Sequence, residues 1–311
     1  MNKKPDVFRF IINPKAGRRD GSYLAGDIES VFAAASGQLD CQIILTERPG
    51  HATKLAADFA AQYKERLVVV ACGGDGTARE VAQGLVSTPA AMSILPIGTA
   101  NDFARVALST CEISQLLPLL PDPHIRPIDA MAIDGEISLN ITSIGFDTKV
   151  QMKAMQLNKQ FRRLGNLSYP LAILLSLLGN RRYRLHYRLQ TVEEDGSLSW
   201  VEQRSDIILA AICNGRYYGG GFNPAPNAKL DDGNLFFCLV DHLPLKRILE
   251  LLPRYRKGTH LGDPAIHTWT VRSGEITAVE GTLLCNYDGD LFTRDHICFR
   301  VLPGAVNFAF Y

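Results

Sequence analysis

The sequence lacks the cysteine patterns that mark disulfide scaffolds and zinc sites. Its seven cysteines are scattered, odd in number and without CxxC spacing. Such usage argues for reduced thiols in a cytosolic protein. Tracts of low complexity and repeats of fixed period are also missing, which argues against a linker protein or a solenoid.

The chain also has no excess of charge of one sign and no long apolar run. Lys and Arg number 33 against 32 Asp and Glu, a net charge of +1, so the molecule as a whole is not an electrostatic nucleic-acid binder. The apolar run at 167–178 is too short for a transmembrane helix, which takes about 20 residues. The first residues lack the apolar core and cleavage site of a signal peptide. We therefore expect a cytoplasmic protein without a transmembrane span or a nucleic-acid partner.

The chain does have enough apolar residues for a full core. At 311 residues, 46% of them hydrophobic, it is expected to form two domains. Its first part alternates short apolar runs with helix-compatible segments. We expect strands at 7–12, 42–45, 67–70 and 93–97 and helices at 23–35, 53–63 and 78–85. This alternation predicts an α/β domain with a doubly wound, mostly parallel sheet.

A glycine-rich turn follows the expected strand at 67–70 and leads into a helix. It consists of Gly73, Gly74, Asp75, Gly76 and Thr77. Glycines let the backbone approach a ligand closely, and the free N–H groups at a helix start favour a phosphate. Because the carboxylate of Asp75 repels a phosphate, we expect a cation between them. A plain turn is the alternative for so short a motif, but the flanking strand and helix favour the phosphate site.

Polar or glycine-rich turns follow all four expected strands. They lie at 13–17, at Thr46, at 73–77 and at 98–101. In a doubly wound sheet the ligand binds outside the carboxyl ends of the strands. We therefore expect these four turns to line one crevice.

The pattern changes after residue 117. Four prolines between 117 and 127 suit a linker better than a helix interior. Short strands with hairpin spacing follow, including 268–271 and 276–279, and predict a mainly antiparallel β-sandwich. We place a nucleotide-binding α/β domain at 1–127 and a β-rich domain at 128–296. The apolar segment 297–311 can return to either.

These motifs resemble the diacylglycerol kinase catalytic-domain family, which includes sphingosine kinases and bacterial lipid kinases of the YegS type. NAD kinases and phosphofructokinases share the glycine-aspartate turn, but the run at 98–103 and the late acidic turn at 288–290 favour the lipid kinases. The matching residues occur in family order across nearly the whole chain: Asn13 to Gly17, Thr46-Glu47, His51-Ala52, Gly73 to Thr77, Glu80, Leu95 to Phe103, Asn140, Gly145 to Asp147, Asn214-Gly215, Gly219 to Gly221, Leu230 to Gly233 and Tyr287 to Asp290.

The resemblance implies a two-domain kinase with ATP in the inter-domain cleft, Mg²⁺ at the phosphates and a lipid hydroxyl as acceptor. The β-rich domain would hold the lipid. Carried over by position, the nucleotide-binding residues are Asn13, Pro14, Lys15, Ala16, Gly17, Thr46, Gly73, Gly74, Asp75, Gly76, Thr77, Ala78, Arg79, Glu80, Thr99 and Asn101.

The resemblance also implies catalytic roles for three carboxylates. Asp75 would engage the phosphates through Mg²⁺, and the base would lie in the late turn, at Asp288 or Asp290. Two residues depart from the family pattern: Arg79 stands where an asparagine is usual, and Asp290 where a glutamate is usual. Because both acidic side chains of the turn are retained, we expect an active enzyme, with the identity of the base open at this point.

A second magnesium site, of structural kind, is implied by the Leu-x-Asp-Gly turn. It maps to the carboxylate of Asp232 with backbone oxygens of Lys229 and Asn234.

A basic segment surrounds the apolar run at 167–178. No Asp or Glu lies between Thr148 and Val192. We expect a peripheral surface that meets anionic lipid headgroups; the alternative is a buried helix flanked by solvated cations. The basic residues are Lys149, Lys153, Lys159, Arg162, Arg163, Arg181, Arg182, Arg184 and Arg188.

Three functions remain in competition. The first is an ATP-dependent lipid kinase that phosphorylates diacylglycerol, phosphatidylglycerol or a similar lipid. The second is a kinase of a soluble acceptor such as NAD, which explains the glycine turn but not the basic segment. The third is a non-catalytic lipid- or nucleotide-binding regulator, to which the two departures give some weight.

Overall fold

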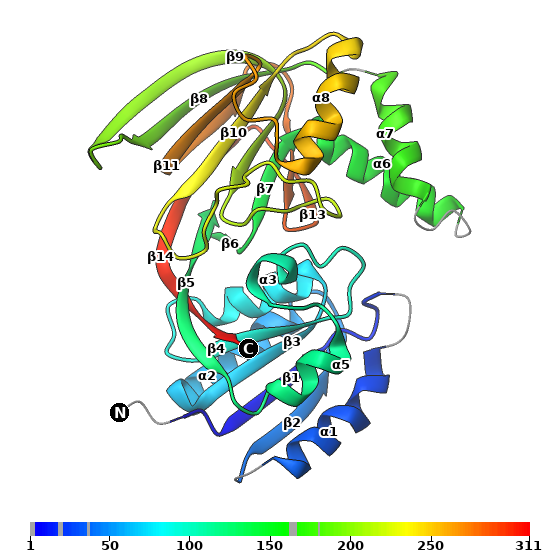
Figure 1. The fold of residues 1–311 in the computed structure, drawn as a ribbon, viewed down its shortest axis with the longest axis vertical. Coiled ribbons are helices and arrows are strands. Elements are labelled where there is room, and N and C mark those ends of the chain that lie inside the picture. Colours follow the sequence, from blue (N-terminus) through cyan, green and yellow to red (C-terminus); the bar gives the residue numbers. More distant parts are fainter. Residues whose placement is uncertain (1–3, 18–20, 36–37, 162–166, 180) are drawn as a thin grey trace.

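The computed structural model has two lobes built on one continuous sheet (Figure 1). It describes residues 4–17, 21–35, 38–161, 167–179 and 181–311. The N-terminal lobe is an α/β unit with parallel strands, and the C-terminal lobe is mainly antiparallel. The predicted fold class is thereby confirmed.

The N-terminal lobe contains a four-stranded parallel sheet. Its strands are β1 (Val7–Ile12), β2 (Asp40–Leu45), β3 (Leu67–Gly73) and β4 (Ala91–Pro96), in the order β4-β3-β1-β2. Strands β1, β3 and β4 are buried along their whole length. Their mostly apolar sequences, with Arg9 in β1 and Ser93 in β4 as buried polar exceptions, follow from this position, because helices cover both faces of a parallel sheet.

Helices cover the two faces as a doubly wound fold requires. Helix α1 (Leu24–Ala34) packs Ile28 and Phe32 against Phe8 and Phe10 of β1. Helices α2 (His51–Tyr63) and α3 (Asp75–Leu85) cover the opposite face. Two short helices, α4 (Ala104–Ala107) and α5 (Ile113–Leu116), follow β4.

In its described residues the C-terminal lobe combines antiparallel strands with three helices. Its strands are β6 (Glu136–Ser138), β7 (Ile141–Gly145), β8 (Tyr183–Val192), β9 (Leu198–Cys213), β10 (Leu235–Asp241), β11 (Ile266–Ala278), β12 (Leu283–Tyr287) and β13 (Asp290–Arg294). Its helices are α6 (Phe146–Gln160), α7 (Ser168–Leu177) and α8 (Leu245–Lys257). None of the helices in the described ranges has the length and apolar character that a membrane span requires.

Two predictions about this half were wrong. The expected strands at 268–271 and 276–279 form one strand, β11, because the polar residues between them stay paired with β8 across a bulge near Ser273. The expected linker up to 127 ends earlier, because β5 (His124–Ile133) begins within it. Pro127 is tolerated since β5 lies off the main path of the sheet, pairing only with β6 and β14 (His296–Phe310).

The C-terminal segment returns to both lobes rather than to one. Strand β14 pairs with β11 in the C-terminal lobe and, through Asn307 and Phe308, with β4 in the N-terminal lobe. Strand β5 runs beside it in the antiparallel direction, and Figure 1 shows the two crossing together between the lobes. These two strands hold the lobes on either side of the cleft described next.

Candidate active site

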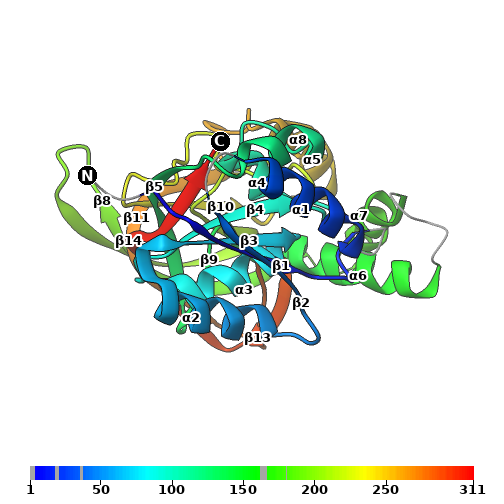
Figure 2. The same ribbon diagram turned by 90° about the horizontal axis from the view of Figure 1, so that it is seen from below.

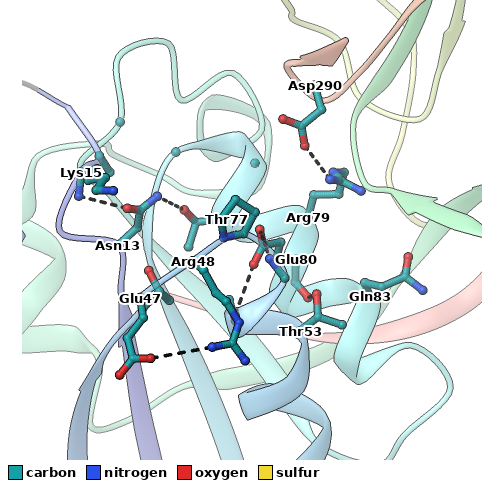
Figure 3. A pocket seen from close by; sticks show the side chains of 18 of the residues that line it. Asn13, Lys15, Glu47, Arg48, Thr53, Thr77, Arg79, Glu80, Gln83 and Asp290 are labelled. Atoms are coloured by element: carbon teal, nitrogen blue, oxygen red, sulfur yellow. Dashed lines mark hydrogen bonds and ion pairs between the residues drawn. The ribbon is translucent and has the colours of Figure 1, made fainter. Parts of the chain in front are cut away.

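A cleft of about 1020 Å³ lies between the lobes, at the carboxyl ends of the parallel strands (Figure 3). Residues from all four predicted turns line it, and the C-terminal lobe supplies the facing wall. The turn residues include Asn13, Lys15, Ala16, Gly17, Thr46, Gly74, Gly76, Thr77, Gly98 and Thr99, and the facing residues include Glu136, Asp290, Leu291 and Phe292.

The turns after β3 and β4 touch through their glycines. A Cβ atom on Gly98 would lie 2.4 Å from the Cα of Gly74, so only glycine allows this approach. Asn13 connects the first turn to the third, because its Nδ2 donates to Thr77 Oγ1 over 3.3 Å and its Oδ1 accepts the backbone N–H of Lys15 over 3.0 Å. The result is a glycine-rich surface at the N-terminus of α3, where a phosphate is favoured.

Some predicted nucleotide residues support the cleft without lining it. Ala78 is buried in the core under α3. Asn101 has a positive φ of 53° and donates from Nδ2 to the carbonyl oxygens of Pro96 and Gly98, which fixes the turn after β4. Gly73 ends β3 against the side chain of Thr77. Pro14 is half-buried in the first turn.

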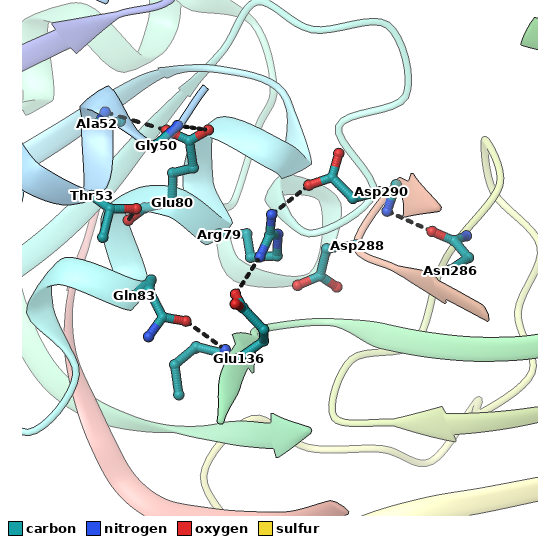
Figure 4. A network of polar contacts seen from close by, with 12 residues as sticks. Gly50, Ala52, Thr53, Arg79, Glu80, Gln83, Glu136, Asn286, Asp288 and Asp290 are labelled. Atoms are coloured by element: carbon teal, nitrogen blue, oxygen red, sulfur yellow. Dashed lines mark hydrogen bonds and ion pairs between the residues drawn. The ribbon is translucent and has the colours of Figure 1, made fainter. Parts of the chain in front are cut away.

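Glu80 connects α3 to the start of α2 (Figures 3 and 4). Its two carboxylate oxygens accept the backbone N–H groups of Gly50 and Ala52 over 2.9 and 3.2 Å. Thr53 Oγ1 donates to the backbone oxygen of Glu80 over 2.8 Å. Glu80 therefore fixes the segment after Thr46, and both of its oxygens are already bonded to protein.

Two carboxylates, the buried Asp102 and the partly buried Asp75, lie behind the glycine turn. Asp75 accepts the backbone N–H groups of Asp102 and Phe103 over 3.1 and 2.9 Å. Burial raises the pKa of Asp75 and raises that of Asp102 to about 6, the latter with a contribution from the charge of Asp75. Asp102 Oδ2 accepts the N–H of Gly220, whereas its Oδ1 is buried without a partner. Two neighbouring carboxylates with an unpartnered oxygen fit a divalent cation.

Asp102 was missed as a site residue by the sequence reasoning. It was noticed as part of the run at 98–103 but was given no role in the site, and its contact with Asp75 depends on how the chain folds back after β4. The polar residues directly after a buried strand were the signal that could have identified it.

The two carboxylates of the late turn occupy different environments (Figure 4). Asp288 is buried, has a φ of 47°, and accepts three backbone N–H groups, from Leu139, Asn140 and Ile141, over 2.7, 3.1 and 3.0 Å. Burial raises its pKa to about 6 against the effect of these bonds. The side chain of Asp290 is 48% exposed and lines the cleft. Asp288 therefore anchors the turn, and Asp290 is the carboxylate that a substrate can reach.

Arg79 spans the cleft from α3 to the C-terminal lobe. Its Nη2 lies 2.5 Å from Asp290 Oδ2 and its Nη1 lies 3.3 Å from Glu136 Oε2. The Arg79 side chain is only 11% exposed, and the three acidic neighbours Asp290, Asp288 and Glu136 raise its pKa against the effect of burial. The two departures from the family pattern, Arg79 and Asp290, are thus in direct contact.

The predicted structural magnesium residues lie in a loop outside the cleft. Asp232 Oδ1 accepts the N–H of Asn234 over 3.0 Å, and the Asn234 Oδ1 atom is buried without a partner. Burial raises the pKa of Asp232, and Asp129 adds to the rise. Asp129, which the sequence reasoning missed, accepts the N–H groups of Gly233 and Gly304. Carboxylate, amide and backbone oxygens of this kind are the ligands that Mg²⁺ prefers.

Comparison with known proteins assigns both lobes. The family model of the diacylglycerol kinase catalytic domain matches residues 7–133, and that of the YegS C-terminal NAD kinase beta sandwich-like domain matches residues 140–310. A probable lipid kinase YegS-like of Pseudomonas aeruginosa PAO1 is 33% identical over 90% of this chain and 89% of its own length. The putative lipid kinase YtlR of Bacillus subtilis is 30% identical over 81% of this chain and 82% of its own.

Solved structures agree with this assignment. A putative diacylglycerol kinase from Bacillus anthracis superposes with a TM-score of 0.76 at 25% identity, over 99% of each chain. The matched order of motifs, the two-lobed fold and the family models lead to one conclusion. The chain belongs to the diacylglycerol kinase catalytic-domain family, with a C-terminal domain of the YegS type, and is a lipid kinase-like phosphotransferase.

Proposed function

We propose that the protein is an ATP-dependent kinase that transfers the γ-phosphate to the hydroxyl group of a lipid such as diacylglycerol or phosphatidylglycerol, with Mg²⁺. The observation that carries this proposal is the cleft, in which a glycine-rich phosphate surface faces the accessible carboxylate of Asp290. Phosphoryl transfer needs little more than positioned phosphates, a cation and a carboxylate near the attacking hydroxyl.

The N-terminal lobe supplies the nucleotide side. Backbone N–H groups at the start of α3 face the phosphates, and the close approach of Gly74 and Gly98 leaves room for them. Lys15 is exposed at the rim of the cleft, where its ammonium group can neutralise phosphate charge. Thr77, oriented by Asn13, presents its hydroxyl to the same space.

The carboxylates of Asp75 and Asp102 are the residues that would hold the catalytic magnesium ion, since Asp102 Oδ1 is buried and unpartnered beside the charge of Asp75. When bound, the ion neutralises the phosphate oxygens and aligns the γ-phosphate. The backbone N–H groups of 102 and 103 fix the orientation of Asp75 before any ligand arrives.

Asp290 is the group we assign as general base. It accepts the proton of the lipid hydroxyl while the hydroxyl oxygen bonds to the γ-phosphorus and ADP leaves with the electrons of the broken P–O bond. Asp288 accepts hydrogen bonds from the backbone N–H groups of residues 139–141 and thereby fixes the turn that carries Asp290. We therefore assign the base to Asp290 rather than to Asp288, a choice that the sequence left open.

A kinase of a soluble acceptor is the second candidate. One observation favours it: the C-terminal lobe matches a domain model described as NAD kinase beta sandwich-like. The lipid kinase remains the better proposal because the relatives that match along most of the chain are named lipid kinases, and because helices α6, α7 and α8 of the C-terminal lobe carry exposed apolar side chains.

Transfer of labelled γ-phosphate to a panel of acceptors tests the proposal. Diacylglycerol, phosphatidylglycerol, a sphingoid base, ceramide and NAD are each offered with ATP and Mg²⁺. The expected result is a labelled lipid that disappears with Asp290→Asn and persists with Glu194→Gln, an exposed carboxylate in the hairpin turn between β8 and β9. Label on NAD alone supports the second candidate, and ATP binding without transfer to any acceptor supports a regulator.

A further inference from the structure

Helices α6 and α7 form a hairpin that projects from one side of the molecule (Figures 1 and 2). Several large apolar side chains on it are exposed to solvent. We call this set the hairpin face, and it consists of Met155, Phe161, Leu167, Leu174, Leu175 and Leu178. Their exposed fractions reach 67% at Leu167 and 78% at Leu178. Exposed large apolar side chains gathered on one helix pair are typical of an interaction surface.

The fold of the hairpin does not need these side chains. Val150, Ala154 and Leu157 of α6 and Ala172 and Leu177 of α7 are buried against the lobe. The apolar run at 167–178 is therefore divided between an inner face that packs and an outer face that does not. The sequence offered two alternatives for this run, a lipid-facing surface and a buried helix. Helix α7 has features of both, because its inner side chains pack against the lobe and its outer side chains are exposed.

Cations accompany the apolar side chains. Lys149, Lys153 and Lys159 lie on α6, and Arg181 follows α7. Burial lowers the pKa of Lys149, and the charges of Lys153 and Arg181 lower it further. Lys153 and Arg181 are therefore both close enough to Lys149 to repel its charge. The hairpin concentrates positive charge beside exposed apolar surface.

The remaining described cations of the predicted basic segment interact with side chains of the β-sheet and its loops instead. Arg182 and Arg184 pair with Asp206, Arg184 also with Glu280, and Arg188 lies over the ring of Trp200. Arg162 and Arg163 lie outside the described residues. Among the described cations of the predicted basic segment 149–188, those on the hairpin or next to it are therefore the candidates for contact with lipid headgroups.

Helix α6 also touches the catalytic turn. Gln151 donates from Nε2 to the backbone oxygen of Gly289 over 2.7 Å, directly between Asp288 and Asp290. Met155 of the hairpin face lies one helical turn further along α6. One helix therefore connects the apolar and basic surface with the residue that the proposed chemistry uses as base.

We propose that the hairpin face docks on an anionic lipid bilayer, inserting its leucines among the acyl chains while its lysines contact the headgroups. This inference rests on the proposed function and names the source of the acceptor. A bilayer matches both features, because apolar burial and attraction to anionic headgroups add in peripheral binding. Because α6 carries part of the hairpin face and also contacts the late turn through Gln151, docking would place the bilayer on the same helix that supports that turn.

Vesicle flotation without nucleotide tests the docking directly. The probes are phosphatidylcholine vesicles with and without phosphatidylserine. The wild-type protein is expected to float preferentially with the anionic vesicles. Lys153→Gln/Lys159→Gln should lower affinity for them about thirtyfold, and Leu174→Gln/Leu178→Gln should lower it for both vesicle types. The matched controls are Lys64→Gln and Leu198→Gln, exposed residues outside the hairpin, which should bind like wild type.

Turnover separates this inference from the proposed function. Diacylglycerol is offered either in vesicles or as a short-chain, water-soluble form. The Leu174→Gln/Leu178→Gln protein should lose turnover of the vesicle form and keep that of the soluble form. If the wild-type protein floated with vesicles but phosphorylated neither form of diacylglycerol, the kinase proposal would be overturned and the docking proposal would stand. If wild type and variants phosphorylated both forms of diacylglycerol and bound all vesicles equally, the docking proposal would be overturned and the kinase proposal would stand.

Two further measurements complete the test. Thermal unfolding midpoints close to wild type are expected for both hairpin variants, because the substituted side chains are exposed. Sedimentation velocity shows whether another copy of the chain covers the surface. A dimer that the leucine substitutions dissociate, together with unchanged flotation, would overturn the bilayer as the occupant.

Discussion

The contact between Arg79 and Asp290 predicts that Arg79 positions the catalytic base. The perturbation is Arg79→Asn, which restores the usual family residue. The Arg79 side chain is 11% exposed and that of Asp290 is 48% exposed. The ion pair is therefore intermediate between surface ion pairs, which contribute up to about 1 kcal/mol, and buried ion pairs, whose disruption costs about 3–5 kcal/mol. We take about 1.4 kcal/mol, which corresponds to about a tenfold fall in rate.

The assay measures kcat and KM for ATP and for the lipid acceptor. If Arg79 acts through Asp290, Arg79→Asn should lower kcat about tenfold with little change in the KM for ATP. An arginine that binds the phosphates directly would instead change the KM for ATP. Glu136→Gln is the matched control, since it removes the other ion pair of Arg79 and leaves the contact with Asp290 in place.

A double variant makes the reasoning refutable. Asp290→Glu alone should be impaired, because the longer side chain meets the guanidinium of Arg79. With Arg79→Asn in addition, the glutamate has room to reach the acceptor, and activity should recover above both single variants. Effects that simply multiply would show that the residues act independently, and the positioning role would then be abandoned.

Three other predictions concern the frame of the site. Asp288→Asn should lower the free energy of unfolding by about 2 kcal/mol in urea denaturation, because an amide offers one oxygen to three N–H donors; a change within error would contradict the anchoring role. Gly98→Ala should weaken ATP binding at least about tenfold in calorimetry, since its Cβ meets Gly74; Gly26→Ala, where a Cβ meets nothing, is the control, and equal binding by both variants would refute the close approach as a requirement. Removal of Mg²⁺ with a chelator should lower the thermal midpoint of wild type but not of Asp232→Asn; the same drop in both would place the stabilising ion elsewhere.

Much of the N-terminal lobe was predictable because its signals are local. The largely apolar sequences of β1 and β3 reflect burial on both faces, and the turn residues follow directly in sequence. The convergence of the four turns then follows from the topology of a parallel sheet. The C-terminal lobe has weaker local signals. Helix α8, with Ile248, Leu251 and Tyr255 buried on one side, has a helical period that was overlooked among the expected strands.

The roles within the site depended on contacts between distant residues. Asp288 and Asp290 have the same chemistry in the sequence, and only the 139–141 backbone distinguishes the anchor from the accessible carboxylate. Arg79 and Asp290 looked like two separate departures from the family pattern until the fold placed them 2.5 Å apart. Asp102 and Asp129 likewise could not be assigned from sequence, because their hydrogen-bond partners, Gly220 and Gly304, lie far along the chain.

The central claim is that Asp290 removes the proton from a lipid hydroxyl in an ATP-filled cleft. The most direct measurement is a single-turnover transfer of labelled γ-phosphate to the accepted lipid by wild type and Asp290→Asn, with ATP affinity measured on the same preparations. We predict unchanged ATP affinity and a loss of transfer of at least about 10²-fold, as expected for a general base. Transfer by Asp290→Asn at the wild-type rate would contradict the account.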